Sequence, residues 1–277
     1  MSRVRPPAVA GLFYPDDPQR LATAVESLLA VDVPADEPVA QALVVPHAGY
    51  VYSGPTAGVA YARLRARPGV SRVVLLGPAH RVWTDGLAVP SVDGFATPLG
   101  MVPIDDALRR RALGVPWVTV DDAPHAREHS LEVQLPFLQR LFGAVSLLPL
   151  AVGDARPHEV AEVLDVLWDG PETLVLVSTD LSHYLDYASA RMRDERTAAA
   201  IVAADAAAIE DDDACGARPL RGLLVAAARR GLDVRLLDLR SSGDTAGDRD
   251  RVVGYGAFAV TPRSAADRAR PSPAAGR

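Results

Sequence analysis

The sequence predicts an α/β protein, a single-domain three-layer αβα sandwich with a central, mostly parallel or mixed sheet. Two observations predict this class. Short apolar runs rich in Val and Leu are typical of strands buried on both faces. Helical segments separate these runs, and strands that alternate with helices favour a sheet covered by helices on both faces. The apolar runs are residues 42–45, 73–76, 145–150 and 174–177.

Helix-start signals follow several of these runs. Asp16, Asp17 and Pro18 predict a helix through about residue 30, because acidic residues and proline suit a first turn. Pro55 predicts another over residues 55–65, because its missing N–H would be unpaired at a first helical position. Ser130 can cap a helix over residues 131–142, although Pro136 predicts a kink or a late start. The other expected helices are residues 105–113, 158–168, roughly 187–208, and a stretch that ends at 230.

The remaining segments complete one expected domain over residues 1–262. Two further strands are expected at residues 234–239 and 253–260. A short strand is expected at residues 86–90, and a turn or hairpin at residues 95–100. Residues 115–130 lack a clear period and predict a polar loop. Residues 263–277, rich in Ala, Pro, Ser and Arg, predict a disordered tail.

Composition excludes several classes of function. The net charge of −6 argues against nucleic-acid binding, which needs a basic patch. No apolar run approaches the ~20 residues that span a membrane, and the N-terminus lacks a signal-peptide pattern, so we expect a cytosolic protein. The chain contains no lysine, which excludes Schiff-base and Walker-lysine chemistry. The single cysteine, Cys215, excludes an internal disulfide and a cysteine-cluster metal site.

Polar residues follow four of the expected strands. His47, His80, the Asp180–His183 pair and Asp244 each come just after an apolar run. Open α/β sheets bind ligands at the carboxyl edge of their strands. Two histidines and a carboxylate are the ligand types of a facial iron site, so we predict His47, His80 and Asp244 as metal ligands. The alternative, that each is a hydrogen-bonded loop residue, stays open for any one of them, but recurrence at four strand ends weakens it.

Two interpretations stay open for the Thr-Asp-Leu-Ser-His-Tyr turn. Asp180 could orient His183 as a general acid or base, or it could cap the turn and leave His183 a bystander. His125 and His129 are four residues apart, but their segment is an expected loop, so we discount a shared metal site. We count His129 as a candidate catalytic residue at the rim of the pocket. Cys215 follows three aspartates that would raise its thiol pKa, which favours a structural role.

Six segments together carry a family resemblance: AGLFYP at 10–15, VPHAGYVYSG at 45–54, GPAH at 77–80, REHSLEVQLPF at 127–137, STDLSHY at 178–184 and ACG at 214–216. Over roughly residues 6–262 the chain resembles the Memo family, whose prokaryotic branch is named AmmeMemoRadiSam system protein B. Memo proteins are similar in fold to class III extradiol dioxygenases, in which two histidines and a glutamate hold ferrous iron.

The resemblance implies roles for individual residues. His47 and His80 would be the histidine ligands and His183 the acid/base. The third position is a cysteine in animal Memo, and here the Ser-Ser-Gly-Asp motif assigns it to Asp244. A carboxylate there favours Fe(II), with copper as the alternative, although Asp is one methylene shorter than the dioxygenase glutamate.

Three functions follow as hypotheses. The leading one is redox or oxygen-dependent chemistry at a mononuclear metal, on a small-molecule or peptide ligand in the cleft. The rival is a non-catalytic binding protein that uses the same cleft, alongside a radical-SAM partner protein as the family name suggests. A metal-dependent hydrolase is the third.

Overall fold

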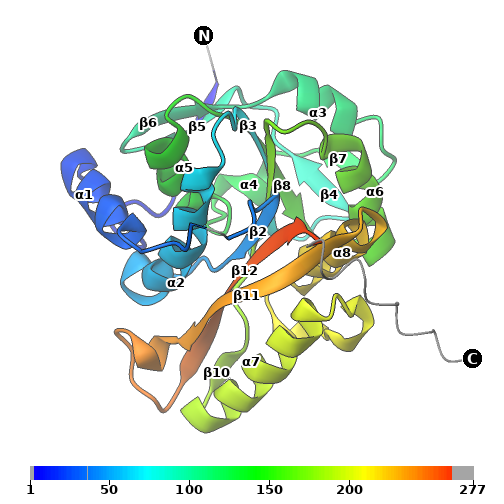
Figure 1. The fold of residues 1–277 in the computed structure, drawn as a ribbon. Helices are drawn as coiled ribbons and strands as arrows, with labels where there is room; N and C mark the ends of the chain where they lie inside the picture. The colour runs from blue at the N-terminus through cyan, green and yellow to red at the C-terminus, as the bar shows by residue number, and fades with distance from the viewer. Residues whose placement is uncertain (1–2, 36, 264–277) are drawn as a thin grey trace, which may run out of the picture.

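A computed structural model describes residues 3–35 and 37–263. Figure 1 shows a central twisted sheet with helices on either side. The helices are α1 (Pro18–Leu29), α2 (Tyr50–Ala62), α3 (Asp106–Ala112), α4 (Ala123–Ala126), α5 (Leu135–Phe142), α6 (Pro157–Leu167), α7 (Tyr187–Val202) and α8 (Ala217–Arg229). The predicted tail lies, apart from Arg263, outside the described residues, and the domain boundary at 262 stays a prediction.

In the described part of the chain, twelve strands form two sheets. They are β1 (Val4–Arg5), β2 (Ala42–Val45), β3 (Arg72–Pro78), β4 (Leu87–Val89), β5 (Gly94–Thr97), β6 (Gly100–Pro103), β7 (Val118–Val120), β8 (Ser146–Val152), β9 (Thr173–Ser178), β10 (His183–Leu185), β11 (Leu232–Ser241) and β12 (Val252–Pro262). The main sheet has the order β10-β12-β2-β9-β3-β8-β4-β7, with β11 paired to β12. A small sheet has the order β1-β5-β6.

The main sheet is mixed, within the predicted class. Strands β2, β9, β3 and β8 are parallel neighbours, whereas β12 pairs antiparallel with β2 and β4 pairs antiparallel with β8. Because β9 lies between β2 and β3, the residues that follow these three strands meet at one edge. This placement positions the candidate site.

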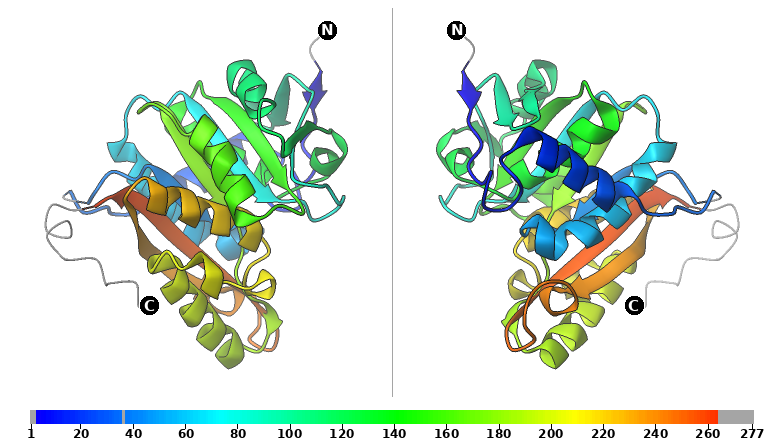
Figure 2. Two further views of the ribbon diagram at one scale, coloured as in Figure 1. Left: turned by 90° about the vertical axis from the view of Figure 1, so that its right-hand side faces the viewer. Right: turned by 90° about the vertical axis from the view of Figure 1, so that its left-hand side faces the viewer.

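Helices cover both faces of the main sheet, which confirms the predicted three layers (Figure 2). Alternate side chains of β2 enter two separate apolar cores. Ala42 and Val44 pack in the core that includes α3, α6 and α8, and Leu43 and Val45 pack in the core that includes α1, α2 and α5. All four are fully buried, as the apolar run predicts.

Two local predictions change, and one open alternative is decided. Helix α2 begins at Tyr50 rather than at Pro55, because the Tyr50 N–H donates to the Phe13 carbonyl and fixes the chain there. Pro55 inside the helix leaves the carbonyl of Val51 without its helical N–H partner, and Val51 is exposed, so water can replace that partner. The expected polar loop contains β7 and α4. Pro136 gives the late start: a 3₁₀ turn at Glu132–Gln134 precedes α5.

No helix among the described residues combines the length and the apolar character needed to cross a bilayer.

Candidate metal centre

Three histidines converge at the carboxyl edge of the central strands. His47 follows β2, His80 follows β3, and His129 comes from the segment between α4 and α5. One potential ligand atom from each lies within 4.8 Å of the others, and this is the group among the described residues that could hold a metal ion. The ring centroids of His80 and His129 are 4.8 Å apart, and that of His47 is 5.2 Å from His80. Three imidazoles at this spacing can enclose one ion.

The hydrogen-bond network fixes the tautomer of His47. The hydroxyl of Ser178 has one proton, which it donates to the Ser130 carbonyl at 2.6 Å. The same oxygen therefore accepts from the Nδ1 of His47 at 2.9 Å and from the Gln134 amide at 2.8 Å. With the proton on Nδ1, Nε2 of His47 is unprotonated and can accept a hydrogen bond or bind an ion. Burial, and then the nearby His80, hold the pKa of His47 well below its usual range, so the ring is neutral.

A buried carboxylate orients His80. Glu128 Oε1 lies 2.9 Å from His80 Nδ1, and its Oε2 accepts from the His80 backbone N–H at 2.8 Å. Burial alone would raise the pKa of Glu128, but the hydrogen bonds from His80 and from the Ser130 backbone outweigh it and lower the pKa to about 2. The ionised carboxylate therefore accepts the Nδ1 proton, which leaves Nε2 of His80 for a ligand. Metal-binding histidines commonly have such a carboxylate partner.

His129 carries an unsatisfied nitrogen. Its Nδ1 is buried and has no hydrogen-bond partner, although Glu128 Oε1 lies 3.2 Å away. The ring lies between His80 and Phe13, with centroids 4.8 Å from each. Burial lowers the pKa of His129 to about 4, so the ring is neutral near pH 7. An orphaned polar atom within a group of three imidazoles fits a metal site.

Cys215 lies against the cluster. Its Sγ is 3.2 Å from Nε2 of His47 and accepts from the Asp180 N–H at 3.3 Å. The next residue, Gly216, must be small, because a Cβ there would lie 2.7 Å from Cβ of Thr179. Burial, and then the charge of Asp180, raise the pKa of the thiol to about 12. The thiol is therefore protonated and donates to His47, which is more than the predicted structural role.

His183 is held by a backbone carbonyl rather than by a carboxylate. Its Nδ1 lies 2.8 Å from the Leu181 carbonyl, which accepts the proton and leaves Nε2 unprotonated. Asp180 accepts from the His47 N–H at 2.7 Å, and its Oδ2 is 3.9 Å from Nε2 of His47. Burial raises the pKa of Asp180 to about 7. Among the described contacts Asp180 makes none with His183, so neither predicted role of Asp180, orienting His183 or capping the turn, matches these contacts.

Comparison with known proteins gives one consistent result. A family profile described as Memo-like protein matches residues 5–259. This chain belongs to the Memo family. A MEMO1 family protein of Aquifex aeolicus is 37% identical over 268 residues, which cover 91% of this chain and 97% of that protein. A MEMO1 family protein of Sulfolobus acidocaldarius is 34% identical, over 91% of this chain and 97% of its own length. One of Methanococcoides burtonii is 36% identical, over 93% of this chain and 100% of its own length.

In this Memo protein Asp244 lies apart from the histidine group. Its Oδ1 accepts from the Tyr187 hydroxyl at 2.6 Å, and its Oδ2 accepts from the Ser241 N–H at 2.9 Å. It follows β11, which is separated from β2 by β12, so two strand spacings of roughly 5 Å each intervene. The expectation that Asp244 supplies the third ligand does not fit this geometry, and His129 takes its place in the cluster.

His125 shows why spacing alone did not identify the site. It is buried, and its Nε2 lies 2.9 Å from the Ala88 carbonyl in β4. It therefore does not share a site with His129, as expected. The sequence did contain signals for His129 and Cys215, in the REHS and ACG segments, but no local pattern tied either to His47.

Proposed function

We propose that this Memo protein binds a single transition-metal ion through His47, His80 and His129, with Cys215 alongside, and performs redox or oxygen-dependent chemistry on a small molecule. The observation that supports this most is the convergence of three imidazoles, two of which have their Nδ1 atoms held by Ser178 and Glu128. Both fixed tautomers leave Nε2 unprotonated.

The donor set suits iron and copper. Imidazole binds both metals, and a thiol within reach adds a softer donor that favours copper more than the predicted carboxylate would. We retain Fe(II) as the expected metal, with copper as its competitor. Bound iron or copper would supply redox chemistry and open coordination positions for oxygen and substrate.

His183 is the residue we assign to proton transfer. Its Nε2 carries a lone pair, and burial lowers its pKa, so it can accept a proton near neutral pH. Asp180, with a pKa of about 7, is a second buried group that can hold a proton beside Cys215. Asp180 follows β9, and His183 is the first residue of β10. Asp180 also accepts from the backbone N–H of His47, one of the clustered histidines.

We also propose a cytosolic location, where reducing conditions would keep Cys215 as a thiol.

A second candidate function is binding of a peptide or partner protein, including a radical-SAM protein. Exposed apolar side chains follow each of three histidines along the chain. Val51, Trp83 and Tyr184 are 68%, 73% and 64% exposed. Exposed apolar groups close in sequence to these three histidines favour a binding surface.

Metal titration tests the proposal directly. Metal-free protein, prepared without oxygen, is titrated with Fe(II) and separately with Cu(I), and binding is measured by calorimetry. The wild type should bind one equivalent, and His47→Ala should lose affinity by on the order of 100-fold or more. His158→Ala is the matched control, because His158 is exposed on α6. Equal binding by wild type and His47→Ala would contradict the proposal.

Oxygen uptake separates the two candidate functions. The iron-loaded protein is incubated with a panel of catechols and other small phenols while dissolved oxygen is recorded. Uptake that depends on His183, tested with His183→Ala, supports catalysis. Stoichiometric metal without uptake on any compound supports the binding function instead.

A further inference from the structure

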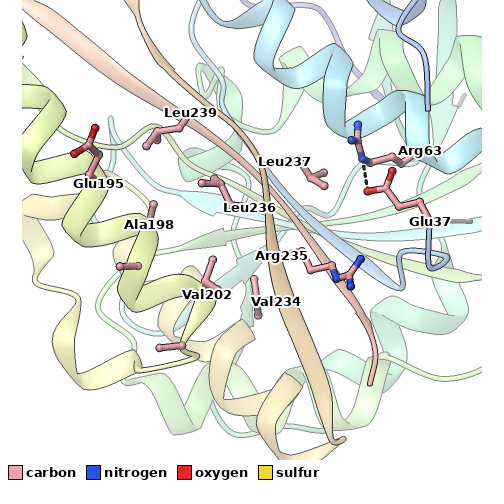
Figure 3. Close-up of a pocket in the computed structure, with 12 residues that line it drawn as sticks. Glu37, Arg63, Glu195, Ala198, Val202, Val234, Arg235, Leu236, Leu237 and Leu239 are labelled. Atoms are coloured by element: carbon pink, nitrogen blue, oxygen red, sulfur yellow. Dashed lines mark hydrogen bonds and ion pairs between the residues drawn. The ribbon is translucent and has the colours of Figure 1, made fainter. Parts of the chain in front are cut away.

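Strand β11 forms an open edge of the main sheet. Nine of its ten residues pair with β12, and among the described residues the strand pairs with no other strand. A groove of about 850 Å³ runs along it. Figure 3 shows this groove between α7, which contributes Ala198 and Val202, and the Arg63–Glu37 ion pair on the far side of the strand. An unpaired strand edge is a template for strand addition.

The groove exposes apolar side chains. Leu236 on β11 and Val202 on α7 are each 43% exposed. Leu237 and Leu239 are only partly buried. A strand added to this edge would cover these groups and also pair the outward backbone of β11.

The charges along β11 are self-complementary. Their order is Asp233, Arg235, Asp238 and Arg240. If a second copy of β11 runs antiparallel about a twofold axis between Leu236 and Leu237, Arg235 lies opposite Asp238 and Asp233 lies opposite Arg240. Each pair then occurs twice. Arg235 is exposed and has no ion-pair partner in the described part of the chain, so a second copy would give it one. Asp238 and Asp233 already pair with Arg240 and Arg263 of the same chain, so they would be shared with the second copy.

A β-bulge makes this register possible. In a regular strand, residues 235 and 238 point to opposite faces and could not pair across a twofold axis. Here the register shifts between Leu236 and Asp238. Leu237 packs with the core on the α2 side, and Asp238 accepts from Thr56 of α2 at 2.8 Å, so both point to that face.

The bulge thereby determines which side chains of β11 lie on each face of the sheet. Figure 3 shows Arg235 and Leu237 on the side of Arg63, and Leu236 and Leu239 on the side of α7. Val234 and Leu239 both pack against the core beneath α7. The register that matches the charges therefore also places Val234 opposite Leu239 on one face. Leu236 and Leu237, on either side of the axis, point to opposite faces and do not pair directly across it.

We propose that a second copy of this chain docks along β11 and continues the sheet across a twofold axis. Charged residues and bulges on an edge generally discourage pairing. In this strand they permit one register, in which each cation meets an anion, and disfavour others. Two chains of net charge −6 repel at long range, so this local complementarity is what would favour association.

Sedimentation velocity over a concentration series tests the proposal on the full chain. The wild type should show a monomer–dimer equilibrium. Arg235→Glu places like charges opposite each other twice and should weaken the dimer by roughly tenfold or more. Arg110→Glu is the matched control, since Arg110 is an exposed arginine on α3, away from β11, and its dimer should match the wild type.

Two further variants fix the register. The double variant Arg235→Glu with Asp238→Arg exchanges the charges and should recover at least part of the association. Leu236→Cys should form a disulfide-linked dimer on mild oxidation, because the two residues 236 would lie diagonally adjacent across the axis. The wild type, whose single cysteine Cys215 is half-buried against His47 and lies outside β11, should not.

Several results would overturn the inference. These are a wild type that stays monomeric at every concentration, Arg235→Glu that associates as tightly as the wild type, or a dimer in which Leu236→Cys fails to cross-link. Circular dichroism confirms that each variant is folded before its association is interpreted.

Discussion

The carboxyl ends of the central strands and the end of β11 look alike in sequence but differ in structure. Both are apolar runs followed by histidine or aspartate residues, which are types that can bind metals or transfer protons. The central strands β2, β9 and β3 are adjacent, so His47, His183 and His80 gather at one place. β11 is an edge strand, so Asp244 bonds to Tyr187 and Ser241 instead. The difference teaches that lateral position in the sheet decides which strand ends share a site.

Ligand removal should give the largest contrast between these two regions. His80→Ala should lower metal affinity by on the order of 100-fold or more, because it removes an imidazole whose Nε2 is free. Asp244→Ala should leave the affinity unchanged, because its carboxylate already bonds to Tyr187 and Ser241. Calorimetric titration of both variants measures this. If Asp244→Ala lost metal affinity as completely as His80→Ala, Asp244 would belong to the metal site, and the distinction between the two strand ends would be wrong.

Glu128 tests whether the carboxylate behind His80 acts on the site. Glu128→Gln keeps the shape but removes the charge that holds the proton on Nδ1, so metal affinity should fall about 10- to 100-fold. Asp244→Asn makes the equivalent change at the end of β11 and serves as the control. A Glu128→Gln protein that is folded and binds metal like the wild type would contradict the role given to Glu128.

His125 tests a buried histidine outside the site. Burial lowers the pKa of His125 from 6.5, its value in the unfolded chain, to about 4 in the folded protein. Between these values the unfolded state binds more protons, so stability falls as the pH falls through this window. Glutamine at this position can still donate to the Ala88 carbonyl but does not titrate. Between pH 7 and pH 5, His125→Gln should therefore lose about 2 kcal/mol less unfolding free energy than the wild type.

Urea unfolding of the metal-free protein at the two pH values measures the effect of His125. His158→Gln is the control, because His158 is exposed and its replacement should not change the acid sensitivity. Equal pH dependence in the wild type and His125→Gln would show that His125 is not responsible.

Ser178 should give the smallest effect. Ser178→Ala removes the acceptor that fixes the proton of His47 on Nδ1, so the ring can adopt the other tautomer, and metal affinity should fall several-fold. Ser242→Ala is the comparison beside β11, where the hydroxyl accepts from the Val253 N–H. An unchanged affinity in Ser178→Ala would mean that the metal itself selects the tautomer.

Much of the fold was predictable because apolar runs of strand length carry their own signal. The positions of His47, His80 and His183 followed from the runs before them. His129 and Cys215 could not be placed this way, because long-range contacts position them. Glu132, three residues after His129, accepts from Arg5 at 2.5 Å and from the Tyr14 hydroxyl at 2.6 Å, which ties that segment to the N-terminal arm.

The expected position of Asp244 beside the histidines does not match the structure, for the opposite reason. Its local pattern was correct, but strand order is set by which apolar faces pack together over the whole chain, and no local pattern shows that β12 separates β11 from β2. The aspartates before Cys215 predicted the correct direction for its thiol pKa, but burial and Asp180 are the causes of the rise. Asp213 pairs with Arg193 and Arg196, so its charge is compensated.

Anomalous diffraction from crystals grown with Fe(II) under anaerobic conditions tests the central claim most directly. The account predicts one anomalous peak at the iron edge, enclosed by the imidazoles of His47, His80 and His129. Absence of a peak among these rings, or a peak at Asp244 instead, would contradict it.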